Sequence, residues 1–227
     1  MLNVSIHKNF LLQILKEIYT DPTLGPLLGF KGGTAAYLFY DLGRFSVDLD
    51  FDLLKESEAA IVFEKLKIVL SQYGKIKESY AKRYTLFFLL SYQDGLHNIK
   101  VEVSKRQFGS RYHLKNYLGI PMLVMIKEDV FAHKLVALIE RKGKTNRDIY
   151  DIWFFLKSQF PINKKIVEMR TRSTYEKAIL QCITILENKN DRGILSGIGE
   201  LLEEKQKNWA KLYLRSDTIF LLTLIVA

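Results

Sequence analysis

The stretch that decides the fold, residues 30–51, reads FKGGTAAYLFYDLGRFSVDLDF. The apolar residues before Gly32-Gly33 predict a short strand, which the two glycines end. Thr34 stands where a helix N-cap belongs, and the apolar residues 35–40 predict a helix after it. Alternation at 47–51 predicts a second strand. The stretch therefore combines a glycine turn at a helix start with a strand that carries two carboxylates.

Asp48 and Asp50 are two residues apart on the second predicted strand, so their side chains share one face, with Cα atoms about 6.5 Å apart. Two carboxylates at that spacing repel each other unless a cation lies between them, and hard oxygen ligands suit Mg²⁺. Glu102, on a strand predicted at 99–103, is the candidate for a third ligand. A charged side chain that faces out of a strand is most often only solvated, and that alternative stays open for Glu102. Asp52, at the strand end, is expected either to be solvated or to support the other acids.

Gly32 and Gly33 permit positive φ angles and a close approach of the backbone to a ligand. The exposed N–H groups of the helix start that follows can bind phosphate. Taken alone, the two glycines are explained better by an ordinary strand-to-helix turn. Their combination with Asp48 and Asp50 is more specific, and it indicates a site for a metal–nucleotide complex.

Periodicity along the rest of the chain predicts an α+β fold. Helical spacing predicts helices at 4–19 and 55–73, and alternation or apolar runs predict strands at 27–30, 76–81, 84–92 and 99–103. Residues 106–121 show no clear period and are assigned to a loop. From residue 127 onward only helical spacing is seen, beginning with helices at 127–142 and 147–159. We therefore expect a mixed sheet flanked by helices in residues 1–115 and an all-helical domain in residues 116–227.

The chain carries a formal net charge of +9, and most of the surplus lies in the second half. Residues 111–227 hold 20 of the 34 Lys and Arg residues but 13 of the 25 Asp and Glu residues. A basic surface attracts polyanions, above all RNA, or an acidic protein partner, although it also serves solubility alone. The following basic residues either line an RNA groove or form a solvated face: Lys142, Lys144, Arg147, Lys164, Lys165, Arg170 and Arg172.

Cysteine usage and hydropathy favour a cytoplasmic protein. Cys182 is the single cysteine, which excludes an internal disulfide, and its apolar helical surroundings predict a buried thiol. The first residues, MLNVSIHK, lack the basic start and apolar run of a signal peptide. The longest apolar run, 218–227, is too short to span a bilayer, and it predicts a closing helix buried in the core.

Three motifs, in order along the chain, resemble one family. The glycine turn and the Arg-x-Ser-x-Asp-x-Asp strand at 44–50 look like the nucleotidyltransferase fold of the DNA polymerase β superfamily. Together with Lys134 and the segment Arg147-Asp148-x-x-Asp151, they look closest to the AbiEii/AbiGii toxin-type nucleotidyltransferases. The resemblance spans about residues 28–157. Thr34 stands where serine is the commoner residue of that family, and its hydroxyl can do the same job.

The resemblance implies that NMP is transferred from an NTP to an acceptor hydroxyl. In this interpretation the three acids already noted, Asp48, Asp50 and Glu102, hold Mg²⁺, or Mn²⁺ in its place. It assigns the NTP to Gly32, Gly33, Thr34, Ser46 and Lys134, and positioning or proton handling near the acceptor to Asp148. It further implies a toxin of a phage-defence pair, silenced by a cognate antitoxin, with the 3′ end of tRNA as acceptor. The active site is then expected in a cleft between the two halves, with the acceptor on the basic side.

Other interpretations of the same residues remain. Without the resemblance, Lys134 and an Arg147–Asp151 pair are ordinary residues of solvated helix surfaces; with it, Arg147 and Asp151 brace the two helices. The acceptor can also be a protein hydroxyl or a small molecule such as an aminoglycoside, although a basic second half suits a cationic drug poorly. A degenerate fold that only binds NTP or nucleic acid is the third interpretation, and the presence of all the acids and of Lys134 argues against it.

Overall fold

The computed structural model describes residues 2–226 of the protein and separates into two units. The first, the sheet unit, extends to Met125 but leaves out two short segments, Leu42–Arg44 and Phe108–Ser110. These two segments belong to the second, the helical unit, which otherwise begins at Ile126. The chain therefore leaves the sheet unit twice before the helical unit proper starts.

Seven strands of the described chain form one mixed sheet in the order β3-β4-β5-β2-β1-β7-β6. The central strands β2 and β5 run parallel, as do β1 and β7, whereas β1 and β2 are antiparallel. The strand bounds are β1 Leu28–Lys31, β2 Leu49–Leu53, β3 Lys75–Ala81, β4 Thr85–Ser91, β5 Ile99–Ser104, β6 Tyr112–Tyr117 and β7 Ile120–Met125. The predicted combination of a mixed sheet with an all-helical C-terminal half is confirmed.

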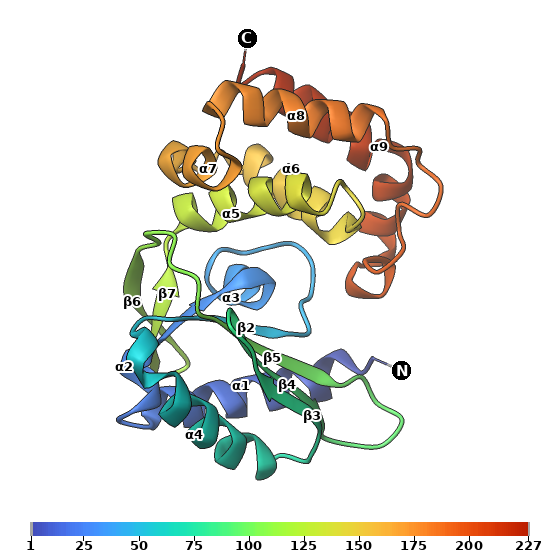
Figure 1. Ribbon diagram of the computed structural model, residues 1–227. Coiled ribbons are helices and arrows are strands. Elements are labelled where there is room, and N and C mark those ends of the chain that lie inside the picture. Colours follow the sequence, from blue (N-terminus) through green and yellow to red (C-terminus); the bar gives the residue numbers. More distant parts are fainter. Residues whose placement is uncertain (1, 227) are drawn as a thin grey trace. The chain divides into compact units, whose positions relative to one another are not determined.

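Alternation along the central strands gives the sheet one apolar face. Phe51, Phe88 and Val101 are fully buried on it, and the polar residues between them in sequence point to the other face. The long helices α1 (Val4–Thr20) and α4 (Ala59–Ser71) lie along one side of the sheet (Figure 1). Phe63 of α4 stacks on Phe88, with ring centroids 4.9 Å apart. The short helices of this unit are α2 (Leu24–Leu27), α3 (Gly32–Phe39) and the 3₁₀ turn η1 (Glu56–Glu58).

The loop predicted at 106–121 is wrong, because much of it folds into the hairpin β6–β7. Leu118 and Gly119 connect the two strands with φ angles of 50° and 82°, as a two-residue turn with positive φ at both positions requires. Neither strand shows the usual sequence signal. β6 is polar and mostly exposed, and β7 contains Pro121, which normally argues against a strand.

The helical unit is built around α5, which packs against α6, α7 and α8, while α9 packs on α6 and α8. Its apolar core includes Phe131 and Leu135 of α5, and Phe155 of α6. Cys182 is buried and free as predicted, and burial raises the pKa of its thiol to about 12, which makes it a poor nucleophile. The bounds are α5 Lys127–Glu140, α6 Asn146–Lys157, α7 Lys164–Thr171, α8 Tyr175–Glu187, η2 Gly199–Leu201 and α9 Glu204–Thr223.

The C-terminal run is helical as far as Thr223, but the prediction that it is buried in the core is wrong. Leu222 is buried, whereas Phe220 and Leu224 are 62% and 59% exposed. The helix is therefore amphipathic at its end, and Ala227 lies outside the described residues. Between residues 2 and 226, no helix is both long and apolar enough to cross a membrane.

A buried histidine ties α1 to the segment that leads into β2. His7 is fully buried, and its Nε2 lies 2.9 Å from the carbonyl oxygen of Val47. A carbonyl can only accept, so Nε2 donates and Nδ1 accepts from the Tyr92 hydroxyl at 2.8 Å. Burial lowers the pKa of His7 below 6.5, because the charged imidazolium is poorly solvated there. In its neutral form, His7 thus holds the backbone of Val47, one residue before Asp48.

This arrangement predicts a loss of stability on mild acidification. Below pH 6.5 the unfolded chain binds a proton at His7 before the folded protein does, so the free energy of unfolding falls as the pH drops below 6.5. We expect a lower urea midpoint at about pH 5.5 than at about pH 7.5 for the wild-type protein, and a smaller difference for His7→Gln. His113→Gln, at an exposed position, should keep the wild-type difference. An unchanged pH dependence in His7→Gln would contradict the assignment.

Candidate functional site

The glycine turn requires its first glycine for two reasons. Gly32 has a φ angle of 80°, a backbone conformation that residues with a side chain rarely adopt. A Cβ atom there would also collide with the side chain of Asp50. Lys31, rather than Thr34, is the N-cap of α3, so the predicted cap is wrong by three residues. The backbone N–H groups of Gly32, Gly33 and Thr34 therefore belong to the first helical turn, where no carbonyl of the helix can accept from them.

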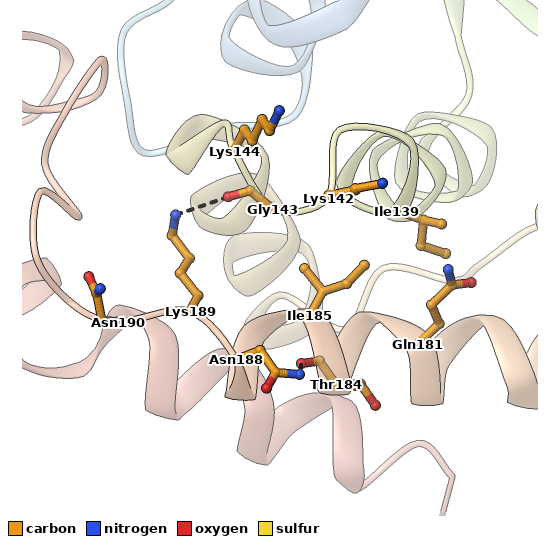
Figure 2. A pocket seen from close by; sticks show the side chains of 10 residues that line it. All are labelled: Ile139, Lys142, Gly143, Lys144, Gln181, Thr184, Ile185, Asn188, Lys189 and Asn190. Carbon is orange, nitrogen blue, oxygen red and sulfur yellow. Dashed lines mark hydrogen bonds between the residues drawn. The ribbon is translucent and has the colours of Figure 1, made fainter.

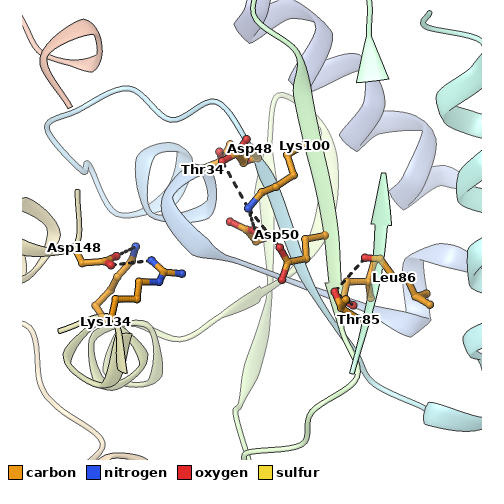
Figure 3. Close-up of polar contacts among 11 residues, drawn as sticks. Thr34, Asp48, Asp50, Thr85, Leu86, Lys100, Lys134 and Asp148 are labelled. Atoms are coloured by element: carbon orange, nitrogen blue, oxygen red, sulfur yellow. Dashed lines mark hydrogen bonds and ion pairs between the residues drawn. The ribbon is translucent and has the colours of Figure 1, made fainter. Parts of the chain in front are cut away.

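Thr34 fixes the segment that carries the first acid. Its hydroxyl donates to the backbone carbonyl of Asp48, and its side chain is buried (Figure 3). Asp48 lies one residue before β2, which begins at Leu49 rather than at the predicted Val47. Ser46 is also buried, in the segment that precedes Asp48. The two predicted motifs are thus joined by a direct hydrogen bond within the sheet unit.

The three predicted metal ligands face one cation, Lys100 of β5. Asp50 and Glu102 are direct neighbours on the parallel strands β2 and β5. The Nζ atom of Lys100 lies 3.9 Å from an oxygen of Asp48, 3.9 Å from one of Asp50 and 3.4 Å from one of Glu102. Figure 3 shows the lysine reaching toward Asp48 and Asp50. Burial lowers the pKa of Lys100, but the charges of these acids outweigh it and raise the pKa above its ordinary value.

Asp52 is separate from this group although it lies on the same face of the sheet. Lys31 donates to one of its oxygens at 2.6 Å, and the Tyr112 hydroxyl donates to the other at 2.5 Å. The residue is 7% exposed, so the alternative of a solvated side chain is wrong for Asp52. Its charge is neutralised locally, which leaves the other acids to share Lys100.

The acids fit a divalent cation by their chemistry, because three carboxylates are hard oxygen donors of the kind that Mg²⁺ and Mn²⁺ prefer. They are arranged around an ammonium group instead: within residues 2–226 no group of three or more His, Cys, Asp or Glu side chains stands ready to hold a metal ion. The N–O distances to Lys100 are longer than metal–oxygen bonds, so a metal would need the acids to close in.

The helical unit contains an alternating chain of charges. Lys134 of α5 lies 3.3 Å from Asp148 and 2.8 Å from Asp151, both of α6. Arg44, from the first inserted segment, binds Asp151 through two nitrogens at 2.6 and 2.8 Å. Arg141 lies 2.7 Å from Asp148 at the other end. The order is Arg44, Asp151, Lys134, Asp148 and Arg141, with three positive charges against two negative ones (Figure 3 shows Lys134 and Asp148).

The two acids of this network and Arg44 are buried, so each must offset the free-energy cost of leaving water. The side chains of Asp148 and Asp151 are 2% and 0% exposed, and that of Arg44 is 2% exposed. Burial alone would raise the pKa of Asp151, but Arg44 and Lys134 hold it below its ordinary value. The same acids raise the pKa of Lys134 against the effect of burial. Asp151 therefore joins α5 to α6, as expected of a bracing residue, and does so through Lys134.

Sequence reasoning missed Lys100, Arg44 and Arg141. Lys100 was accessible in principle, since it is two residues before Glu102 on one strand and so shares its face. Arg44 was read as part of the acid motif, and nothing local indicates a partner 107 residues away. Arg141, the C-cap of α5, is seven residues after Lys134, a spacing that places the two on one side of the helix but does not identify Asp148 as their common partner.

A basic pocket of about 670 Å³ lies elsewhere in the helical unit, between the end of α5 and α8 (Figure 2). Lys142, Lys144 and Lys189 line it, and no acid does. Lys189 donates to the carbonyl of Gly143 at 3.0 Å. Two of the basic residues noted in the sequence therefore lie together at a concave surface, whereas Arg170 is paired with Glu140.

The alternating chain of charges predicts that loss of the Asp151 charge lowers the free energy of unfolding. Asp151→Asn leaves the buried Arg44 without its counter-charge, and we expect the free energy of unfolding to fall by about 3–5 kcal/mol. Asp191→Asn removes a carboxylate from a surface pair with Arg215 and should cost under about 1 kcal/mol. Urea unfolding of both variants measures the difference. An equal loss of unfolding free energy in the two variants would show that the buried pair adds no more to stability than the surface pair.

Two solved structures share this fold along almost the whole chain. The crystal structure of a "putative nucleotidyltransferase" from H. pylori matches with a TM-score of 0.60 and 18% identity, covering 98% of this chain and 94% of its own. The crystal structure of JHP933 from Helicobacter pylori matches with a TM-score of 0.57 and 17% identity, covering 98% and 91%. At such identities the likeness shows the fold alone. No curated protein matches the chain.

A family model decides the identity. The model of the nucleotidyl transferase AbiEii toxin of Type IV toxin–antitoxin systems matches residues 13–215. The match includes the glycine turn, the acids around Lys100 and the charge network of the helical unit. The protein therefore belongs to the AbiEii family of toxins and is a nucleotidyltransferase.

Proposed function

We propose that the protein transfers NMP from an NTP to a hydroxyl group of RNA, at the 3′ end of tRNA, in a reaction that depends on Mg²⁺ or Mn²⁺. The observation that carries the proposal is the grouping of Asp48, Asp50 and Glu102 around one cation, beside the turn at Gly32. Three acids that share a cation on a sheet face, next to the N-terminal N–H groups of a helix, suit a metal–triphosphate complex.

In the sheet unit, the roles divide between phosphate and metal. Gly32, Gly33 and Thr34 offer backbone N–H groups to the phosphates, and Ser46 belongs to the same nucleotide-binding set. Asp48, Asp50 and Glu102 would hold the divalent cation. When bound, that cation neutralises phosphate charge and favours attack at the α-phosphate. Thr34 has a second role through its side chain, because its hydroxyl fixes the backbone of Asp48.

In the helical unit, we assign Lys134 to the triphosphate. The alternating chain has one positive charge in excess, which suits an anionic ligand. Both oxygens of Asp148 already accept from cations, Lys134 and Arg141, and this favours positioning of those cations over proton transfer. An acceptor hydroxyl then attacks the α-phosphate and loses its proton to solvent; a new P–O bond forms, the bond to the β-phosphate oxygen breaks and pyrophosphate leaves.

The acceptor and the partners follow from charge and family. The net charge of +9 and the pocket lined by Lys142, Lys144 and Lys189 support a polyanionic acceptor. Family membership implies a cognate antitoxin that silences the toxin. We place the reaction in the cytoplasm, where NTPs and tRNA are found, and we infer a role in phage defence.

The acids are tested by labelling. Asp50→Asn should reduce the transfer of label from an α-labelled NTP to total RNA by roughly a hundredfold or more, because positioned charge supplies most of the rate. Asp48→Ala should do the same. Asp94→Asn, on an exposed loop of the same unit, serves as the matched control and should label at the wild-type rate. Undiminished labelling by folded Asp50→Asn protein would refute the assignment.

The basic pocket is tested by salt dependence. Replacing Lys142, Lys144 and Lys189 together by glutamine removes three positive charges. We expect weaker RNA binding, and a slope of log affinity against log salt that is shallower by about 2. A triple substitution of Lys67, Lys75 and Lys77, which are exposed residues of the sheet unit outside this pocket, is the control. Equal salt slopes for the pocket variant and the wild-type protein would remove the pocket from the RNA-binding surface.

A further inference from the structure

Lys100 lies at the position that the metal ion of the proposed function would take. Its ammonium group occupies the place between Asp48, Asp50 and Glu102 at which a divalent cation would be held. Lys100 is two residues before Glu102 on β5, so the strand alternation directs it into the group of acids rather than away from it. A lysine and a metal ion cannot both lie at the centre of these three carboxylates.

We propose that Lys100 is a built-in counter-ion, which holds the three acids together while no metal is bound and is displaced when a divalent cation enters. The proposal rests on the proposed function, since it takes these acids as the metal ligands. Lys100 is thus a positioning residue that competes with the metal in the absence of nucleotide.

The contacts of Lys100 are suited to displacement. Its distances of 3.9 Å to Asp48 and Asp50 are too long for hydrogen bonds, and its hydrogen bond to Glu102 is long at 3.4 Å, so charge more than directed bonding holds it there. Lys31 on the same sheet is different, because its ammonium lies 2.6 Å from Asp52 in a direct bond. The flexible stem of a lysine lets its charge move away without a change in the backbone.

Charge balance indicates when the displacement occurs. Three carboxylates and one ammonium leave a net charge of −2, and a bare divalent cation must push the ammonium aside to reach all three acids. A metal–NTP complex instead brings phosphate oxygens, which offer the displaced ammonium a new partner. We therefore expect metal to bind weakly alone and much more tightly together with nucleotide, with Lys100 causing most of the difference.

Lys100→Met tests the proposal, because methionine keeps the stem and removes the charge. Binding of Mn²⁺ is followed by the loss of the free-ion electron paramagnetic resonance signal, without any NTP present. We expect Mn²⁺ to bind Lys100→Met at least roughly tenfold more tightly than the wild-type protein. In chelator, Lys100→Met should melt at a lower temperature than the wild type, and Mn²⁺ should restore it. Lys100→Arg, which retains the charge, should bind Mn²⁺ as weakly as the wild type.

Lys65→Met is the matched control, since Lys65 has the same 33% exposure but pairs with Asp21 alone. It should leave Mn²⁺ affinity unchanged. Equal Mn²⁺ affinity in Lys100→Met and the wild type, with binding abolished by Asp50→Asn, would overturn the counter-ion while the metal site stands. If neither Lys100→Met nor Lys100→Gln gains affinity and Asp50→Asn changes nothing, the metal site of the proposed function fails as well.

Discussion

Repulsion among Asp48, Asp50 and Glu102 is the constraint on which the sheet unit depends. Three carboxylates on one face of a sheet cannot stay close together without a cation. In this protein the cation is Lys100, supplied by the same strand as Glu102. The turn at Gly32 is equally constrained, because only a residue without a Cβ atom fits against Asp50. The backbone turn proposed to bind phosphate and the acids proposed to bind metal are thereby fixed next to each other within a single unit.

The helical unit solves a similar problem in a different way. Its acids Asp148 and Asp151 are buried, and each lies between two cations of an alternating chain. Such a chain leaves neither carboxylate unpaired, and it keeps Lys134 charged in a buried place. The sheet unit holds its acids through one ammonium at 3.4 to 3.9 Å, whereas the helical unit holds its acids through several cations at 2.6 to 3.3 Å. This difference suits the proposed entry of a metal among the acids of the sheet unit and a fixed position for the acids of the helical unit.

Local pattern was sufficient for most of the fold and for part of the site. Alternation placed Asp48 and Asp50 on one face and turned Glu102 away from Val101 and Val103; the pairing of β2 with β5 then makes Asp50 and Glu102 direct neighbours. The pairing of Arg44 with Asp151 was out of reach, since it joins residues 107 positions apart and depends on tertiary packing. Hairpin β6–β7 was missed because a polar edge strand and Pro121 remove the usual apolar signal.

The reaction itself can be tested by the position of the label in the nucleotide. The protein is incubated with total RNA, Mg²⁺ and each NTP, labelled either at the α-phosphate or at the γ-phosphate. Nucleotidyl transfer predicts that the α-label enters RNA while the γ-label leaves as pyrophosphate. Appearance of the γ-label in RNA, or release of pyrophosphate with no label in any acceptor, would contradict the account.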